Sequence, residues 1–194
     1  WGRPFYILRE AWNILNAIAE GKIESGDEKK LNALKGETMA VIALCQFDLT
    51  RCFGYPYTKD NGASLGAPLI DHLVGTYENP SRSTVAQAYD FIIETLGEAV
   101  TLMSEEENNG RMNKYAARAL LARVYLYHND NRKAFDMAEQ LIKDVDASGS
   151  YALYPHEKYV AAWSVETKFG SESFFEIANS VDDTPGRDSW GYLL

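Results

Sequence analysis

Apolar residues recur every three or four positions along several stretches of the chain, and this spacing predicts amphipathic helices. Asp27 stands where a helix N-cap is expected, and Thr84 followed by Gln87 is typical of a capping box. These polar signals support the starts of two helices independently of the apolar pattern. The three ranges with this pattern are 4–19, 27–53 and 83–103.

A glycine lies inside the longest of these predicted helices. Gly36 is unfavourable there by roughly 1 kcal/mol relative to alanine. Because a helix does not carry such a residue without cost, we predict that Gly36 marks a close contact with a second helix.

Residues 110–145 predict two antiparallel helices joined by the turn HNDNR. The first of these helices is apolar on most of its faces, which favours a central position in the fold. One such hairpin cannot bury its own faces, so neighbouring helices are required. The spacing of Leu121, Ala122, Tyr125 and Ala134, with Ala138 at the next contact position, is that of a tetratricopeptide hairpin. The residues predicted to be buried on the second helix, over 132–145, are Ala134, Phe135, Ala138, Leu141 and Ile142.

The segment 55–83 is rich in proline and glycine and has no lasting apolar period, which predicts a long loop inserted between helices. Loops of this length without structure are uncommon unless they are functional. The tyrosines Tyr55, Tyr57 and Tyr77 serve no helical stripe there. A second irregular region begins after Gly149, where SFFEIA fits either a strand or an extended segment.

Composition excludes several classes of protein. Hydrophobic residues make up 46% of the 194 residues, so a real core is expected. The net charge of −9 provides no basic footprint for nucleic acid and no basic helix for a membrane surface. No apolar run of about 18 residues is present that would span a bilayer.

The two cysteines, Cys45 and Cys52, fall in one predicted helix. Their separation along that helix corresponds to about 10 Å, whereas a disulfide needs less than about 7 Å between Cα atoms. We therefore predict two free thiols, both buried as small apolar side chains.

The sequence gives little support for a catalytic or metal-binding site. His128 lies in the hairpin turn, where a solvated side chain is expected, and His72 and His156 lie in loops. No nucleophile-elbow, zinc-protease, phosphate-loop or dinucleotide motif is present. We predict no catalytic residues, no metal and no cofactor.

The order of motifs resembles the SusD/RagB family of outer-membrane nutrient-binding lipoproteins. The resemblance runs through LKGETMAVIALCQFDLTRCFG, the loop with APLI, SRSTVAQAYDFIIETLGEAVTLM, the hairpin and SESFFEIA. Tyr6 and Asn13 also match the family's early helix, whereas Trp12 replaces a residue that is usually small. Family members are more than twice as long, so residues 1–194 are interpreted as a single helical domain from the central part of a longer protein.

The resemblance implies a mainly α fold with tetratricopeptide-like hairpins and long irregular loops. It further implies capture of a glycan or other nutrient at the cell surface, without catalysis, beside a TonB-dependent (SusC-like) outer-membrane transporter. The membrane would be reached only through a lipid anchor outside this chain.

Sugars present flat C–H faces bounded by hydroxyl groups, so aromatic rings beside amides and carboxylates suit them. The predicted ligand-binding residues from the loop are Tyr55, Tyr57, Tyr77, Asp60 and Asn61. Trp1 is added because the family often places a ligand-contacting aromatic residue just before this first helix.

Two alternatives remain open. One is a tetratricopeptide-type module that binds a peptide in a groove lined by Asn113, Lys114 and Arg118. The other is a carbohydrate-active enzyme, which needs two carboxylates facing each other across a cleft. The sequence cannot show such a pair.

Overall fold

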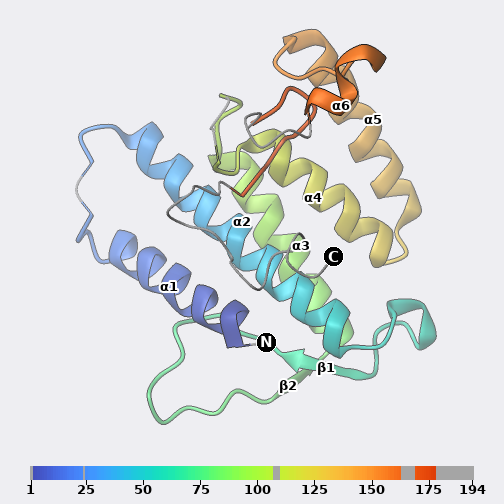
Figure 1. Cartoon of the computed structure of the whole chain (residues 1–194). Coiled ribbons are helices and arrows are strands. Elements are labelled where there is room, and N and C mark those ends of the chain that lie inside the picture. The colour runs from blue at the N-terminus through green and yellow to red at the C-terminus, as the bar shows by residue number, and fades with distance from the viewer. Residues whose placement is uncertain (1, 24, 107–109, 163–168, 178–194) are drawn as a thin grey trace.

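The computed structural model describes residues 2–23, 25–106, 110–162 and 169–177, and this part of the chain is mainly helical (Figure 1). The predicted mainly α fold is confirmed. The helices are α1 (Gly2–Ala19), α2 (Glu28–Phe53), α3 (Val85–Leu102), α4 (Lys114–Tyr127), α5 (Asn131–Ser148) and α6 (Tyr159–Ala162). The shorter elements are η1 (Tyr57–Lys59), η2 (His156–Lys158), β1 (Leu65–Pro68) and β2 (Arg82–Thr84).

Each long helix packs mainly against the helix next to it in the chain. α2 lies between α1 and α3, and α4 lies between α3 and α5 (Figure 1). Successive stacking of this kind is the arrangement of helical repeats. It places α2, α3 and α4 at the centre, as the all-round apolar character of α4 predicts.

The predicted helix starts are confirmed by their caps. The Asp27 carboxylate accepts from the backbone N–H groups of Lys29 and Lys30 at 3.0 and 3.3 Å. Thr84 and Gln87 form a reciprocal capping box at the start of α3. Each cap satisfies amide groups that a helix start would otherwise leave without an acceptor.

The core lies between α2, α3 and α4. Phe47 from α2 contacts Tyr89 from α3 edge-on, with ring centroids 6.2 Å apart. Small residues on all three helices let their backbones approach closely. Fully or nearly fully buried members of this core are Ala40, Ala43, Phe47, Ile92, Leu96, Ala99, Ala117, Leu121 and Val124.

The predicted close contact at Gly36 is present. An added Cβ atom would lie 2.6 Å from Cγ of Met103 and 2.9 Å from the carbonyl oxygen of Ala99. α2 and the end of α3 therefore meet at a point where a side chain does not fit.

The segment 55–83 contains more regular structure than its sequence indicates. β1 and β2 pair antiparallel, with Leu65 opposite Thr84 and Pro68 opposite Arg82. The Arg82 guanidinium donates to the carbonyl oxygens of Leu65 and Gly66. Because the two strands are short and separated by an irregular segment, neither has the alternating pattern that reveals a strand.

Two side chains fix this segment to the helices. Gln46 is fully buried, donates to the Pro68 carbonyl at 3.1 Å and accepts from the Ile70 amide at 3.3 Å. The indole N–H of Trp12 donates to the Ile70 carbonyl at 3.2 Å. The loop is thereby anchored to both α1 and α2.

Three predictions of burial are wrong. Phe135 and Ile142 on α5 are 58% and 61% exposed, because their face of the helix points away from α4 and no other described element covers it. Both cysteines are free thiols as predicted, but only Cys45 is buried. Cys52 lies on the solvent side of the last turn of α2.

Candidate ligand-binding site

Two of the predicted tyrosines present their rings to solvent. Tyr55 is 58% exposed, and the Lys59 ammonium lies 3.0 Å from the centre of its ring. Tyr77 is 96% exposed in the segment between β1 and β2. An exposed ring can lie against the apolar face of a sugar. At Tyr55 a sugar would use the ring face that Lys59 does not cover, or displace that ammonium group.

The three other predicted loop residues build the turn around η1. The Tyr57 ring lies 4.3 Å from that of His128 and 5.7 Å from that of Tyr89. Asp60 accepts a hydrogen bond from the Ser64 hydroxyl, and Asn61 adopts a left-handed backbone with φ of 55°. These side chains hold the turn that follows Tyr55, and their part in ligand binding remains a prediction.

His128 is not the solvated side chain that its place in the turn suggests. It is half-buried, with its ring against Tyr57 and 5.6 Å from Tyr89. Its Nδ1 atom is buried without a hydrogen-bond partner among the described residues. His128 therefore joins the α4–α5 turn to the loop by ring packing.

The exposed tyrosines are not brought together. Figure 1 shows η1 and the 70–80 segment at opposite ends of the β1–β2 sheet. Tyr55, next to η1, and Tyr77, in the 70–80 segment, therefore belong to different ends of the loop. Trp1, the remaining predicted ligand-binding residue, lies outside the described residues.

His72 joins the carboxylates of Asp71 and Glu78 in the segment that carries Tyr77, and we call this arrangement the His72 clip. The His72 ring nitrogens lie 2.6 Å from the Asp71 carboxylate and 2.7 Å from that of Glu78, which also accepts from the Gly75 amide at 3.0 Å. Hydrogen bonds with Asp71 and then Glu78 raise the pKa of His72 above its usual 6.5. Hydrogen bonds from the Gly75 amide and then His72 lower the pKa of Glu78 below its usual 4.5.

This clip predicts a pH dependence of local order. The His72 contribution is complete below pH 6.5 and is lost as the pH rises through the raised pKa of His72. The Glu78 contribution is complete above pH 4.5 and is lost as the pH falls through the lowered pKa of Glu78. We expect the Gly75 amide, corrected for intrinsic exchange, to be best protected between these limits.

In a hydrogen-exchange measurement, His72→Gln should keep the low-pH part, which arises from Glu78 and the Gly75 amide, and abolish the high-pH part of that dependence. His156→Gln, which changes an exposed histidine outside the segment, should retain it. An unchanged profile in His72→Gln would contradict the clip.

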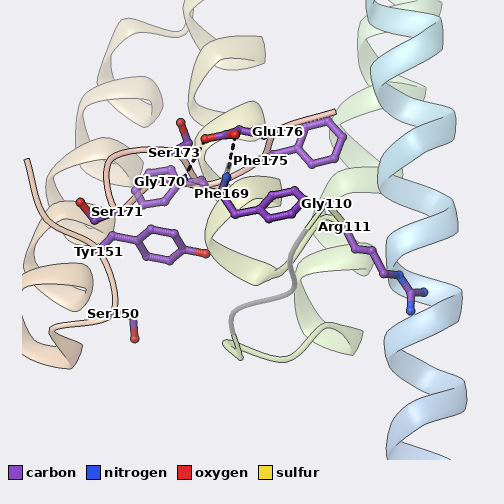
Figure 2. A pocket seen from close by; sticks show the side chains of 11 residues that line it. Gly110, Arg111, Ser150, Tyr151, Phe169, Gly170, Ser171, Ser173, Phe175 and Glu176 are labelled. Carbon is purple, nitrogen blue, oxygen red and sulfur yellow. Dashed lines mark hydrogen bonds between the residues drawn. The ribbon is translucent and has the colours of Figure 1, made fainter. Parts of the chain in front are cut away.

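A second hollow lies beside the irregular segment after α5. It has a volume of about 180 Å³ and is lined by aromatic rings, serine side chains and one carboxylate (Figure 2). Drug-sized ligands occupy pockets of roughly 300 Å³ or more, so this hollow suits only a small group. Its aromatic lining residues are Tyr151, Phe169, Phe174 and Phe175.

The carboxylate in this hollow has a structural role. Glu176 accepts from the backbone amides of Phe169 and Gly170 at 2.9 and 3.1 Å (Figure 2). Burial acts to raise the pKa of Glu176, but these bonds and one from Ser173 outweigh it and hold the pKa below its usual value. A glycosidase acid needs the opposite shift and a second carboxylate.

Sequence reasoning did not single out the residues of this hollow. The aromatic residues without a helical period after Gly149 were the available signal. Tyr151 and Phe174 pack edge-on at 4.9 Å, and the Tyr151 hydroxyl accepts from Asn113 at 2.7 Å. These rings serve packing as well as lining the hollow.

Two of the three residues predicted to line a peptide groove, Asn113 and Arg118, are buried. Asn113 is 3% exposed, caps the Ala116 amide and binds Tyr151. Arg118 is 9% exposed and forms an ion pair with Asp144 at 2.7 Å. Because α5 covers this side of α4, the side chains are used inside the fold.

A family model described as "Starch-binding associating with outer membrane" matches residues 1–126, which is more than half of the chain. The chain belongs to the SusD-like family. The resemblance inferred from the order of motifs is thereby confirmed.

Solved SusD-like structures share the fold. A SusD superfamily protein from Bacteroides vulgatus ATCC 8482 is 94% identical over 100% of this chain and 44% of its own, with a TM-score of 0.96. Another from Bacteroides thetaiotaomicron VPI-5482 is 39% identical over 94% of this chain and 39% of its own, with a TM-score of 0.88. This SusD-like chain thus spans less than half of either protein.

A more distant SusD-like structure is described as a laminarin binding SusD-like protein. It is 23% identical over 98% of this chain and 39% of its own, with a TM-score of 0.70, and shows the fold alone. A comparison with curated proteins gives no significant match.

Two features of other classes of protein do not occur in the described part of this SusD-like chain. None of its described helices is both long and apolar enough to cross a bilayer. No group of three or more candidate metal-binding side chains occurs among the described residues.

Proposed function

We propose that this chain contributes to a cell-surface glycan-binding protein that works beside a TonB-dependent (SusC-like) transporter at the outer membrane. Its family is described as starch-binding and associating with the outer membrane. The glycan would be held by ring contacts and hydrogen bonds, and no bond in it would be cleaved.

The observation that carries this proposal is the exposure of Tyr55 and Tyr77 in a member of this family. Both rings lie in the irregular segment after α2, which is anchored to α1 and α2 through Trp12 and Gln46. Trp1, Tyr57, Asp60 and Asn61 complete the proposed ligand-binding residues. Laminarin, the ligand in the description of one fold neighbour, is a reasonable first glycan to test.

Removal of the exposed rings should weaken glycan binding. A ring contact contributes about 1 kcal/mol, or roughly fivefold in Kd. We expect Tyr55→Ala and Tyr77→Ala each to weaken laminarin or maltooligosaccharide binding by about that factor in calorimetry. Because the rings lie apart, the two losses should add only for a ligand long enough to reach both.

Tyr159→Ala is the matched control, because Tyr159 is 50% exposed on α6, away from the loop. It should bind as the wild type does. Equal binding by the wild type and by a double variant that combines Tyr55→Ala with Tyr77→Ala would contradict the proposed site. Release of reducing ends from the glycan would contradict the non-catalytic proposal.

A further inference from the structure

Two arginines meet at one tyrosine near the ends of α2 and α4. The guanidinium groups of Arg51 and Arg123 both lie beside the Tyr127 side chain and lower the pKa of its hydroxyl. Their guanidinium carbons lie 5.3 and 6.0 Å from the centre of the Tyr127 ring, and 4.7 and 5.9 Å from that of Phe47. Two positive charges are thus held together in a chain whose net charge is −9.

The nearby negative charge does not balance the two arginines. Asp48 forms an ion pair with Arg51, but no carboxylate of the described residues forms one with Arg123. The Nε atom of Arg51 is also buried without an acceptor among those residues. Asp48 therefore pairs with Arg51 alone, and the repulsion between the two guanidinium groups favours a further anion near Arg123.

Apart from the Asp48 carboxylate, which is paired with Arg51, the charged and hydroxyl groups of this site are hydrogen-bond donors. A guanidinium has no acceptor atom. The Tyr127 hydroxyl, beside both guanidinium groups, carries a proton that it can donate to a ligand. With Tyr127 43% exposed and Arg123 exposed, a ligand can reach them. A group that only accepts, such as a carboxylate or sulfate, fits better than a sugar hydroxyl.

The site adjoins the proposed glycan-binding loop. His128 directly follows Tyr127 and packs against Tyr57, at 4.3 Å between ring centres. Figure 1 shows η1 next to the turn between α4 and α5. An oxyanion bound between the arginines could therefore belong to a glycan that also contacts the loop.

We propose that Arg51, Arg123 and Tyr127 bind a carboxylate or sulfate group of an acidic glycan. This inference rests on the proposed function and narrows it, because starch carries no such charge. Uronic acids and sulfated sugars share this oxyanion chemistry, and the test separates them.

The experiment measures Kd of the full chain for trigalacturonate, maltotriose and sulfated maltotriose by calorimetry. We expect at least one acidic sugar to bind about tenfold more tightly than maltotriose at low salt. The better acidic sugar identifies the source of the oxyanion. Because the site is partly exposed, the preference should fall as NaCl rises to 0.5 M.

Arg123→Gln should remove the preference for the acidic sugar and leave maltotriose binding unchanged. Tyr127→Phe, which retains the ring against Phe47, should reduce the preference for the acidic sugar. Arg132→Gln is the matched control, because it removes the same charge from α5, where the guanidinium pairs with Asp136 at 2.9 Å.

Equal affinity for acidic and neutral sugars in the wild type would overturn the inference but leave the proposed function intact. An equal loss in Arg123→Gln and Arg132→Gln would also overturn it, since the effect would then come from net charge alone. Absence of binding to all three sugars would count against both proposals. Circular dichroism of each variant establishes that the fold is retained.

Discussion

Replacing Gly36 with alanine is expected to destabilise the protein by up to about 2 kcal/mol, although alanine is the better helix former. The new Cβ atom would lie 2.6 Å from the Met103 side chain and 2.9 Å from the Ala99 carbonyl oxygen. Overpacking typically costs about 1–3 kcal/mol, which exceeds the gain of roughly 1 kcal/mol in helix propensity. Met103 is flexible, but the backbone of α3 cannot move aside without separating it from α2.

Gly97→Ala is the matched control for this prediction. Gly97 lies inside α3, and an added Cβ atom there would meet nothing within 4 Å. The same chemical change should therefore stabilise the protein by up to about 1 kcal/mol. Urea unfolding measures both free energies of unfolding, and stabilisation of similar size by both variants would contradict the close contact at Gly36.

Replacing Gln46 with leucine should lower the free energy of unfolding by about 2–4 kcal/mol, more than Gly36→Ala does. The side chain is fully buried and bonds both the Pro68 carbonyl and the Ile70 amide. Leucine keeps most of the volume but leaves both backbone groups without this partner, and a buried unpaired group costs about 1–3 kcal/mol. Exchange of the Ile70 amide should accelerate along with the loss of stability.

Gln140→Leu tests whether the effect belongs to the site. Gln140 is exposed on α5, where it donates to Asp144 at 2.9 Å. Its replacement should change the free energy of unfolding by less than about 0.5 kcal/mol. If both variants lost equal stability, the anchoring role of Gln46 would be wrong.

Gln46 also connects the helical scaffold to the proposed function. The loop that carries Tyr77 leaves α2 near its end and returns through β2, and between them Gln46 and Trp12 fix Pro68 and Ile70. A protein that binds glycans with exposed rings gains by holding those rings still, because less entropy is lost on binding. Glycan affinity should therefore fall in Gln46→Leu even though this residue is buried.

The helices could be predicted from sequence because their signals are local. The Asp27 cap and the Thr84–Gln87 box act within three residues, and the apolar stripe of each helix repeats within one or two turns. Gly36 was also informative, since an unfavourable residue inside a helix indicates a packing constraint. The family followed from the order of these elements, and the match over residues 1–126 confirms it.

The candidate site depended on contacts between segments that lie far apart in the chain. Tyr55 and Tyr57 look equivalent in sequence, yet one ring is exposed and the other packs on His128. The Arg51, Arg123 and Tyr127 cluster joins the ends of two helices that no local pattern pairs. β1 and β2 were not predicted either, because their pairing also joins segments that lie apart in the chain.

By itself the sequence determined the helices, their boundaries and the family, because backbone capping and apolar periodicity act between near neighbours. The tertiary structure decided which aromatic rings remain free for a ligand, which face of α5 stays uncovered and where positive charge gathers on an acidic chain. Exposure and charge at a surface are sums over every segment that meets there, so they exist only once the chain is folded.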